Sequence, residues 1–275
     1  MSSIRRPWLA TLALITLATL CAMLHGCAAR RRERQERLPP EQIYAMAMEK
    51  MAHKRYYTAR GMLQEALPRI PPEDRILLPK VQLAIADSFY KDGGSLNFGE
   101  ALNGYRNFLT YFPQHEEADR AQFMVGMSLF KQVLAPDREQ SLTLKAIDEF
   151  RKVETIYPDS AFVQQGRDQI LLCQDRLAEH ERVVGWFYQR RKAWPAAIDR
   201  YRQILETYPR YSATSRVLYD LGRCLLAQGN RAEAEQALDR LAHDDPQGPF
   251  AVKAKDLLAR YDHGKKKEVG KERKP

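Results

Sequence analysis

Cys27 is the residue whose type and surroundings point most directly to a chemical modification. It follows Leu24-His25-Gly26, and the four residues resemble a bacterial lipobox, in which cleavage before the cysteine leaves it as a lipid-bearing N-terminus. A diacylglyceryl group on the sulfur and an amide-linked acyl chain together give the lasting membrane attachment that one chain would not. His25 departs from the Ala or Ser usual at its position. An ordinary signal sequence with a chance cysteine is the alternative interpretation.

The segment before Cys27 has the order of a secretory signal. A positively charged start that ends at Arg6 is followed by an apolar stretch from Trp8 to Leu24. A stretch of this length with these flanks is too short for a stable membrane span. We therefore expect residues 1–26 to be a signal peptide. Ala28 follows the cysteine where an aspartate would favour inner-membrane retention, so we expect a lipid anchor on the periplasmic face of an outer membrane.

The rest of the chain offers little that could catalyse a reaction. It has no Gly-rich phosphate loop, no Gly-x-Ser-x-Gly elbow and no His-Glu-x-x-His helix. Its histidines are scattered, and none has a partner at metal-ligand spacing. Glu179-His180-Glu181 is the one suggestive cluster, but adjacent helix positions point in different directions, so we expect a solvated helix face. The sequence predicts no enzyme, no metal site and no cofactor other than the lipid on Cys27.

The net charge of +9 is concentrated at the ends of the chain. Residues 28–37 carry five basic and two acidic side chains, residues 265–275 carry six and two, and residues 38–264 are close to neutral. A neutral body has no basic face for nucleic-acid phosphates, so nucleic acid is not an expected partner. We expect residues 27–40 to be a flexible basic linker lying against anionic headgroups, and residues 263–275 a basic disordered tail.

Five copies of one helical pattern form the body. Each copy has an alanine three residues after its first residue, large apolar residues beyond it, and a proline at its end. The proline ends a helix because it lacks an N–H group and forces its predecessor out of the helical region. The copies begin at Tyr56, Phe98, Thr143, Trp194 and Arg231 and end at Pro71, Pro113, Pro158, Pro209 and Pro246.

Another helical segment precedes each copy, with a small residue where two helices would cross. Helix–turn–helix units of this kind are typical of tetratricopeptide repeats, so the sequence predicts an all-α superhelix of about five repeats. Residues 159 to 190 predict one long helix, and residues 249–261 predict a capping helix. Such arrays bind polypeptides in a groove, so the expected function is binding. The small residues are Ala47, Ala86, Gly126, Gly185 and Gly222.

We expect the N-terminal repeats 1–3 to span residues 41–158. The long helix, repeats 4–5 and the capping helix are expected over 159–262. Repeats two and three carry insertions between their helices, at Asp92–Ser95 and Gln132–Gln140. The two cysteines of the body lie in helical, apolar-periodic segments, where small buried hydrophobes are the better expectation than a disulfide. They are Cys173 and Cys224.

The fourth repeat and its surroundings resemble the BamD (YfiO/ComL) family, the lipoproteins of the β-barrel assembly machinery. Five repeats behind a lipobox also match that family's architecture. The resemblance covers nearly all of residues 27–261. The resemblance rests on the stretch from Leu177 to Arg200 and on Tyr208-Pro209. In addition, Asp137-Arg138-Glu139 is similar to an Asp-Arg-Asp motif of the family, and Tyr157–Phe162 is similar to its Tyr-Pro-Asn-Ser-x-Tyr turn.

The resemblance implies a scaffold that docks through its C-terminal repeats onto the POTRA domain of BamA nearest the barrel. The N-terminal repeats would engage unfolded outer-membrane β-barrel proteins, and other lipoproteins of the machinery are further candidate partners. A BamA-contacting arginine of the family matches Arg200, with Arg191 and Trp194 nearby. A guanidinium suits a carboxylate across an interface. The alternative is a surface arginine of little energetic weight.

The resemblance is weaker in the first half, where Ile70–Pro79 replaces the family's Tyr-Pro-Phe-Gly-Pro-Tyr turn. Tyr56, Phe89, Tyr90 and Phe98 could line a substrate groove, although aromatic residues at helical spacing belong more often to a core. Another tetratricopeptide lipoprotein, such as a type IV pilus pilotin or a Tol- or cell-division-associated adaptor, is the first alternative function. An envelope enzyme with a repeat domain is the second.

Overall fold

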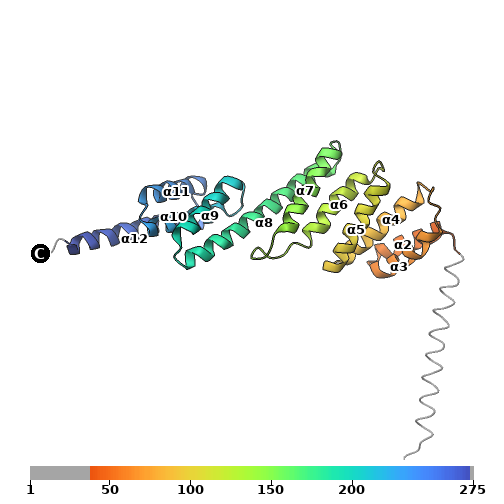
Figure 1. Cartoon of the computed structure of the whole chain (residues 1–275), viewed down its shortest axis with the longest axis horizontal. Helices are drawn as coiled ribbons and strands as arrows, with labels where there is room; N and C mark the ends of the chain where they lie inside the picture. The colour runs from red at the N-terminus through yellow and green to blue at the C-terminus, as the bar shows by residue number, and fades with distance from the viewer. Residues whose placement is uncertain (1–37, 273–275) are drawn as a thin grey trace, which may run out of the picture. The chain divides into compact units, whose positions relative to one another are not determined.

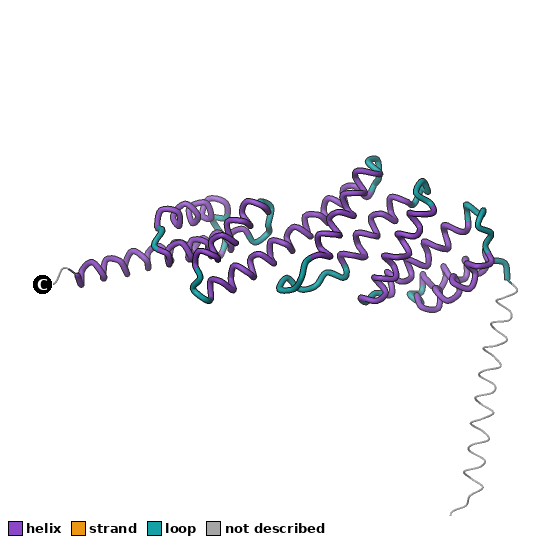
Figure 2. Tube along the Cα trace, viewed as in Figure 1, coloured by secondary structure: helices purple, strands orange, loops and turns teal. Residues whose placement is uncertain are grey.

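The computed structural model describes residues 38–272, with side chains to residue 263. This part of the chain consists of helices and loops, as Figures 1 and 2 show, so the all-α prediction is confirmed. Cys27 and the signal peptide lie outside the described residues. The helices are α2 (Pro40–Ala52), α3 (Tyr56–Ala66), the 3-10 turn η1 (Leu67–Arg69), α4 (Leu77–Asp92), α5 (Ser95–Tyr111), α6 (Ala118–Phe130), α7 (Ser141–Ile156), α8 (Phe162–Arg190), α9 (Trp194–Thr207), α10 (Thr214–Gln228), α11 (Arg231–Asp244) and α12 (Pro249–Glu272).

The five predicted repeats are helix pairs: α2 with α3, α4 with α5, α6 with α7, α8 with α9, and α10 with α11. The predicted crossing residues are buried at these contacts. A Cβ atom added to Gly126 would lie 2.6 Å from Phe150 of α7, and one on Gly185 2.7 Å from Tyr201 of α9. One on Gly222 would lie 2.7 Å from Leu238 of α11. The glycine at each of these three crossings therefore lets an aromatic or leucine side chain of the partner helix fill the space.

The chain forms two compact units that divide between Gly104 and Tyr105, inside α5. In the first unit, α2, α3 and α4 share a core that includes Ile43, Leu63 and Val81, each fully buried. The grouping of repeats 1–3 apart from repeats 4–5, with a boundary at residue 158, stays a prediction.

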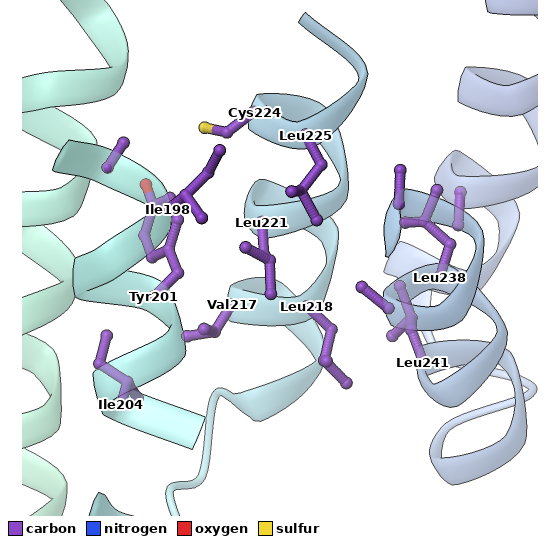
Figure 3. Close-up of a cluster of buried hydrophobic side chains, with 14 of the residues drawn as sticks. Ile198, Tyr201, Ile204, Val217, Leu218, Leu221, Cys224, Leu225, Leu238 and Leu241 are labelled. Atoms are coloured by element: carbon purple, nitrogen blue, oxygen red, sulfur yellow. The ribbon is translucent and has the colours of Figure 1, made fainter. Parts of the chain in front are cut away.

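The second unit has its own core between α9, α10 and α11 (Figure 3). Tyr201 of α9 and Leu238 of α11 point toward the side chains of α10 that lie between them, among which is Cys224. Cys173 of α8 is also buried, and both cysteines are free, as predicted. Burial raises the pKa of both thiols to about 12, so they act as small apolar side chains at neutral pH.

The long helix is confirmed: α8 has 29 residues, which corresponds to about 43 Å at the rise of an α-helix. It packs against α7 as well as α9 and therefore belongs to two neighbouring pairs. Asp92–Ser95 is a tight turn through Gly93 and Gly94, whose φ angles are 77° and 86°. Residues 131–140 form a longer loop between α6 and α7.

The prediction for the C-terminal end needs a correction. α12 does not end at residue 261 but runs to Glu272, so the segment predicted as disordered from residue 263 is helical up to that point. The extension is rich in Lys and Glu, which are good helix formers, and it contains no proline to end the helix.

Candidate functional site

The turn between α8 and α9 places the three residues predicted to contact a partner. The N–H of Lys192 donates to the carbonyl of Gln189 and that of Ala193 to the carbonyl of Tyr188, each at 3.0 Å. This pattern is a Schellman motif, and Lys192 holds its left-handed position with a φ of 59°. Pro195, in the first turn of α9, suits a helix start because the missing N–H would lack a partner there anyway. The turn therefore fixes the direction of the side chains on both sides of it.

Arg200 lies on α9 and points back to α8. Its Nη1 donates to Oε2 of Glu181 at 2.8 Å, and the two side chains are 39% and 19% exposed. Glu181 lies on α8 and Arg200 on α9, on opposite sides of the turn, and the packing of the two helices brings them together. A guanidinium has five N–H donors, and those not used by Glu181 remain for another acceptor. Arg200 thus has an internal partner that the sequence interpretation did not include.

Arg191 and Trp194 have different surroundings. Trp194 is half-buried and packs against the core of α9, α10 and α11, so its ring supports the fold. Arg191 is exposed, and its guanidinium carbon lies 3.9 Å from the ring centre of Phe187, one helical turn earlier. Of the three predicted residues, the structure brings Arg191 alone into a group of exposed side chains.

That group consists of Trp186, Phe187, Arg190 and Arg191 at the end of α8, and we call it the arginine–aromatic patch. Arg190 lies 4.8 Å from the ring centre of Trp186, in the same relation as Arg191 to Phe187. Trp186 and Phe187 are 42% and 45% exposed. The four side chains line a hollow of about 300 Å³.

The acidic residues of this part of α8 are engaged elsewhere. Glu179 accepts hydrogen bonds from Arg182 and from the hydroxyl of Tyr211. Burial favours its neutral form, but these hydrogen bonds outweigh burial and hold the pKa of Glu179 below its ordinary value. Glu181 pairs with Arg200. Among the described side chains, none forms an ion pair with Arg190 or Arg191.

The solvated face expected at Glu179-His180-Glu181 is wrong. All three side chains are half-buried. A ring nitrogen of His180 lies 2.6 Å from the carbonyl oxygen of Pro136, in the long loop between α6 and α7. The three neighbours point in different directions, as expected, but each direction meets another element: the loop, α9, or the segment before α10. Within the part of the chain that the structure describes, no group of His, Cys, Asp and Glu could hold a metal ion.

The four aromatic residues suggested for a substrate groove are half-buried in the first unit. The rings of Tyr90 and Phe98 meet edge to face, with centres 5.5 Å apart. Phe89 lies under the guanidinium of Arg60 at 4.1 Å, and Tyr56 packs against the core of α2, α3 and α4. These contacts use the rings to hold helices together, and a groove lined by them stays a prediction.

Sequence reasoning missed Trp186, Phe187 and Arg190, although a signal was present. Two aromatic residues are followed four positions later by two arginines, a spacing that places each cation over a ring on one helix face. It also missed Arg60, which is 7% exposed and pairs with Asp92 at 2.9 Å. No local sequence pattern predicts this ion pair, because Arg60 and Asp92 are far apart in the chain.

Comparisons with known proteins agree on a family. The family described as "YfiO: Outer membrane lipoprotein" matches residues 36–237. The outer membrane protein assembly factor BamD of Vibrio cholerae is 27% identical over 191 residues, covering 66% of this chain and 77% of that protein. The protein of the same name from Caulobacter vibrioides is 23% identical over 247 residues, and the aligned region covers 89% of this chain and 79% of that protein.

Solved structures with some likeness are helical repeat proteins. The TPR2AB domain of yeast Sti1 in complex with an HSP90 peptide shares 13% identity over 82% of this chain and 86% of that chain, with a TM-score of 0.43. YrrB, described as a TPR protein with an unusual peptide-binding site, shares 14% identity over 84% of this chain and 97% of its own, with a TM-score of 0.35. None of the described helices combines the length and apolarity needed to cross a membrane.

Proposed function

Since this chain belongs to the YfiO family of outer membrane lipoproteins, we propose that it is a periplasm-facing scaffold of the β-barrel assembly machinery. The observation that carries the proposal is the family match over residues 36–237, which spans helix pairs of both compact units. The assembly factors of Vibrio cholerae and Caulobacter vibrioides support it, because this chain spans more than two thirds of each. The protein binds other polypeptides and is not an enzyme.

We propose that repeats 4 and 5 dock on a POTRA domain of a BamA-like protein through the turn between α8 and α9. Arg191 is exposed there, and Arg200 keeps part of its guanidinium accessible. The N-terminal repeats would engage unfolded outer-membrane β-barrel proteins, with Tyr56, Phe89, Tyr90 and Phe98 as the candidate contacts. Other lipoproteins of the machinery are further candidate partners.

Attachment to the outer membrane would come from a lipid on Cys27. The lipobox-like sequence supports this proposal, and so does the family's description as outer membrane lipoproteins. The basic residues between Cys27 and the first helix would lie next to anionic headgroups, each contributing about 1 kcal/mol near such a surface.

Co-purification of the chromosomally expressed, tagged protein with the BamA-like protein of the same bacterium tests the docking. Arg200→Glu is expected to reduce the recovered BamA-like protein at least about tenfold, as loss of a buried charged contact does. The substitution also places two carboxylates together, because Arg200 pairs with Glu181. Arg210→Glu, at an exposed position after α9, is the matched control and is expected to leave recovery unchanged.

A charge swap separates the two effects of Arg200→Glu. The double variant Glu181→Arg with Arg200→Glu restores the ion pair between α8 and α9 but not a contact from position 200 to a partner carboxylate. Recovery that stays low in the double variant supports direct contact by Arg200. Recovery that returns to the wild-type level assigns Arg200 to positioning of the helix pair. Failure of the wild-type protein to co-purify with the BamA-like protein overturns the docking proposal.

A further inference from the structure

We propose that the arginine–aromatic patch of α8, made of Trp186, Phe187, Arg190 and Arg191, is the docking surface for a partner polypeptide that carries a carboxylate beside an apolar side chain. The apolar side chain enters the hollow between the rings, and the carboxylate binds the two guanidinium groups. The proposal rests on the proposed function, because it names the surface and chemistry of the partner contact. It moves the centre of that contact from Arg200 to the end of α8.

The two aromatic side chains of the patch lie outside the core of the second unit, although the ring of Phe187 meets that of Tyr188 edge to face. Tyr188 and Trp194 pack against the core of the second unit, whereas Trp186 and Phe187 are not among the residues of that core. Both residues leave more than two fifths of their surface to solvent. Trp and Arg are the residue types that most often dominate binding energy in protein interfaces. A partner that covers these rings would therefore bury apolar surface that is exposed to water in the isolated chain, and this burial would favour binding.

The stacking of the arginines leaves their hydrogen-bonding edges available. A guanidinium that lies over a ring uses its face for the cation–π contact, while its N–H groups point outward in its plane. Arg190 and Arg191 have no carboxylate partner among the described side chains. Two neighbouring guanidinium groups of this kind can bind one carboxylate with charge-assisted hydrogen bonds.

The charge around the patch selects an acidic occupant. Arg190 and Arg191 are followed by exposed Lys192, so three cations stand in sequence at the end of α8. The chain's own terminal segments, residues 28–37 and 265–275, are both net basic, and like charge disfavours them as occupants. A hollow of about 300 Å³ lies at the small end of ligand-pocket sizes and accommodates a side chain rather than a lipid chain.

The patch is held in place before any partner arrives. The Schellman hydrogen bonds fix the end of α8 directly after Arg191, and Gly185, one residue before the patch, packs under the ring of Tyr201. A surface already ordered in this way loses less conformational entropy on binding.

Site-specific photo-crosslinking of the full-length lipoprotein in its own cells tests the proposal. The crosslinking amino acid p-benzoylphenylalanine is introduced at position 187, in the patch, and at position 144 as a control. Leu144 of α7 is 53% exposed, similar to Phe187 at 45%. The crosslinked peptide of the partner is then located by mass spectrometry. We expect a crosslink from position 187, and none of the same peptide from position 144, to a segment with Asp or Glu next to an apolar residue.

Charge reversal completes the test. Arg190→Glu with Arg191→Glu, in the chain that carries the probe at position 187, is expected to reduce the crosslink at least about tenfold, as loss of a charge-paired contact does. Arg210→Glu is expected to leave it unchanged. A crosslink to lipid alone, to a second copy of this chain, or to a segment without acidic residues overturns the proposal. So does the absence of a crosslink, or one that the double reversal leaves intact.

The outcomes distinguish this proposal from the proposed function. A crosslink to an acidic, apolar segment of a POTRA domain supports both. A charge-sensitive crosslink to such a segment of a different protein supports the patch and overturns POTRA docking through it. Co-purification of the BamA-like protein that continues when the double reversal is made, without a charge-sensitive crosslink to any acidic, apolar segment, leaves the proposed function standing and overturns the patch.

Discussion

Asp220 of α10 is a buried carboxylate, 5% exposed. Carboxylate oxygens of Asp220 lie 3.7 Å from Arg216 and 3.6 Å from Arg223, beyond ordinary hydrogen-bond distance. Burial raises the pKa of Asp220 above its usual value, although Arg223, Arg216, Arg182 and the side-chain amide of Gln189 act in the opposite direction. An ionised carboxylate in such a position costs stability that a neutral side chain of the same shape would not.

Asp220→Asn is expected to raise the free energy of unfolding at pH 7. A carboxyl whose folded-state pKa is raised binds more protons in the folded state, so its ionisation lowers stability as the pH rises through the folded pKa. The gain from Asn should therefore be largest at pH 7 and shrink toward pH 3, where the wild-type carboxyl is protonated in both states. Urea unfolding at the two pH values measures it.

A gain of equal size at both pH values would contradict this assignment. Asp148→Asn is the matched control, because the Asp148 side chain is 69% exposed. It is expected to change the free energy of unfolding by less than about 0.5 kcal/mol at pH 7.

At the scale of single side chains, the sequence predicted the site in part. The family-like stretch identified Arg191 and Arg200, but the pairing of Arg200 with Glu181 depends on two helices meeting across a turn. The roles of Trp194 and Trp186 were not separable from residue type, because one ring lies over the core and the other is exposed. The periodicity of apolar residues predicts the helix, but the packing of the next helix determines which aromatic residue stays exposed to solvent.

At the scale of elements, the sequence predicted more. The five small crossing residues and the ends of the second helices follow directly from spacing and proline chemistry, and the structure has them there. The prediction for the end of α12 was wrong because the basic composition of the tail was interpreted as a sign of disorder. The prediction for Glu179-His180-Glu181 was wrong because the loop before α7, α9 and the segment before α10 all contact α8 at these three residues, which no local pattern reveals.

The crossing glycines give a prediction about the helix pairs. Gly185→Ala is expected to destabilise the protein by about 1–3 kcal/mol, because its Cβ would lie 2.7 Å from the ring of the fully buried Tyr201. Gly61→Ala is the control, since a Cβ at that exposed position of α3 meets nothing within 4 Å. It is expected to stabilise by about 0.5–1 kcal/mol through helix propensity. Thermal unfolding followed by circular dichroism measures both, and a neutral Gly185→Ala would contradict close packing at the crossing.

At the scale of the whole molecule, the excess positive charge lies in the terminal segments, one of which adjoins the proposed lipid anchor at Cys27. The body is close to neutral while the segments at both ends are basic. The division of the chain inside α5 was not predicted, because repeat spacing shows which helices pair but not how the pairs group into compact units.

Cys27→Ser tests the proposed anchor. The variant is expected to move from the membrane fraction to the soluble periplasmic fraction and to lose labelling by radioactive palmitate, because the cysteine sulfur is the first acceptor of lipid and several acyl chains supply the attachment. Cell fractionation and labelling measure this, with His25→Ala as a control that keeps both. A Cys27→Ser protein that stays with the membrane would show that attachment does not depend on the lipid.

The double membership of α8 constrains how the length of this helix can vary among relatives. Each residue added to an α-helix turns everything beyond it by about 100° and advances it by about 1.5 Å. One residue inserted between Gly166, where a Cβ would lie 3.4 Å from the backbone oxygen of Phe150 of α7, and Gly185, at the α9 crossing, would rotate the α9 crossing by about 100° away from the side of α8 that packs against α7. Seven residues would nearly restore the helical phase, with a residual rotation of about 20°. Changes in the length of α8 between those two contacts should therefore come in whole pairs of turns.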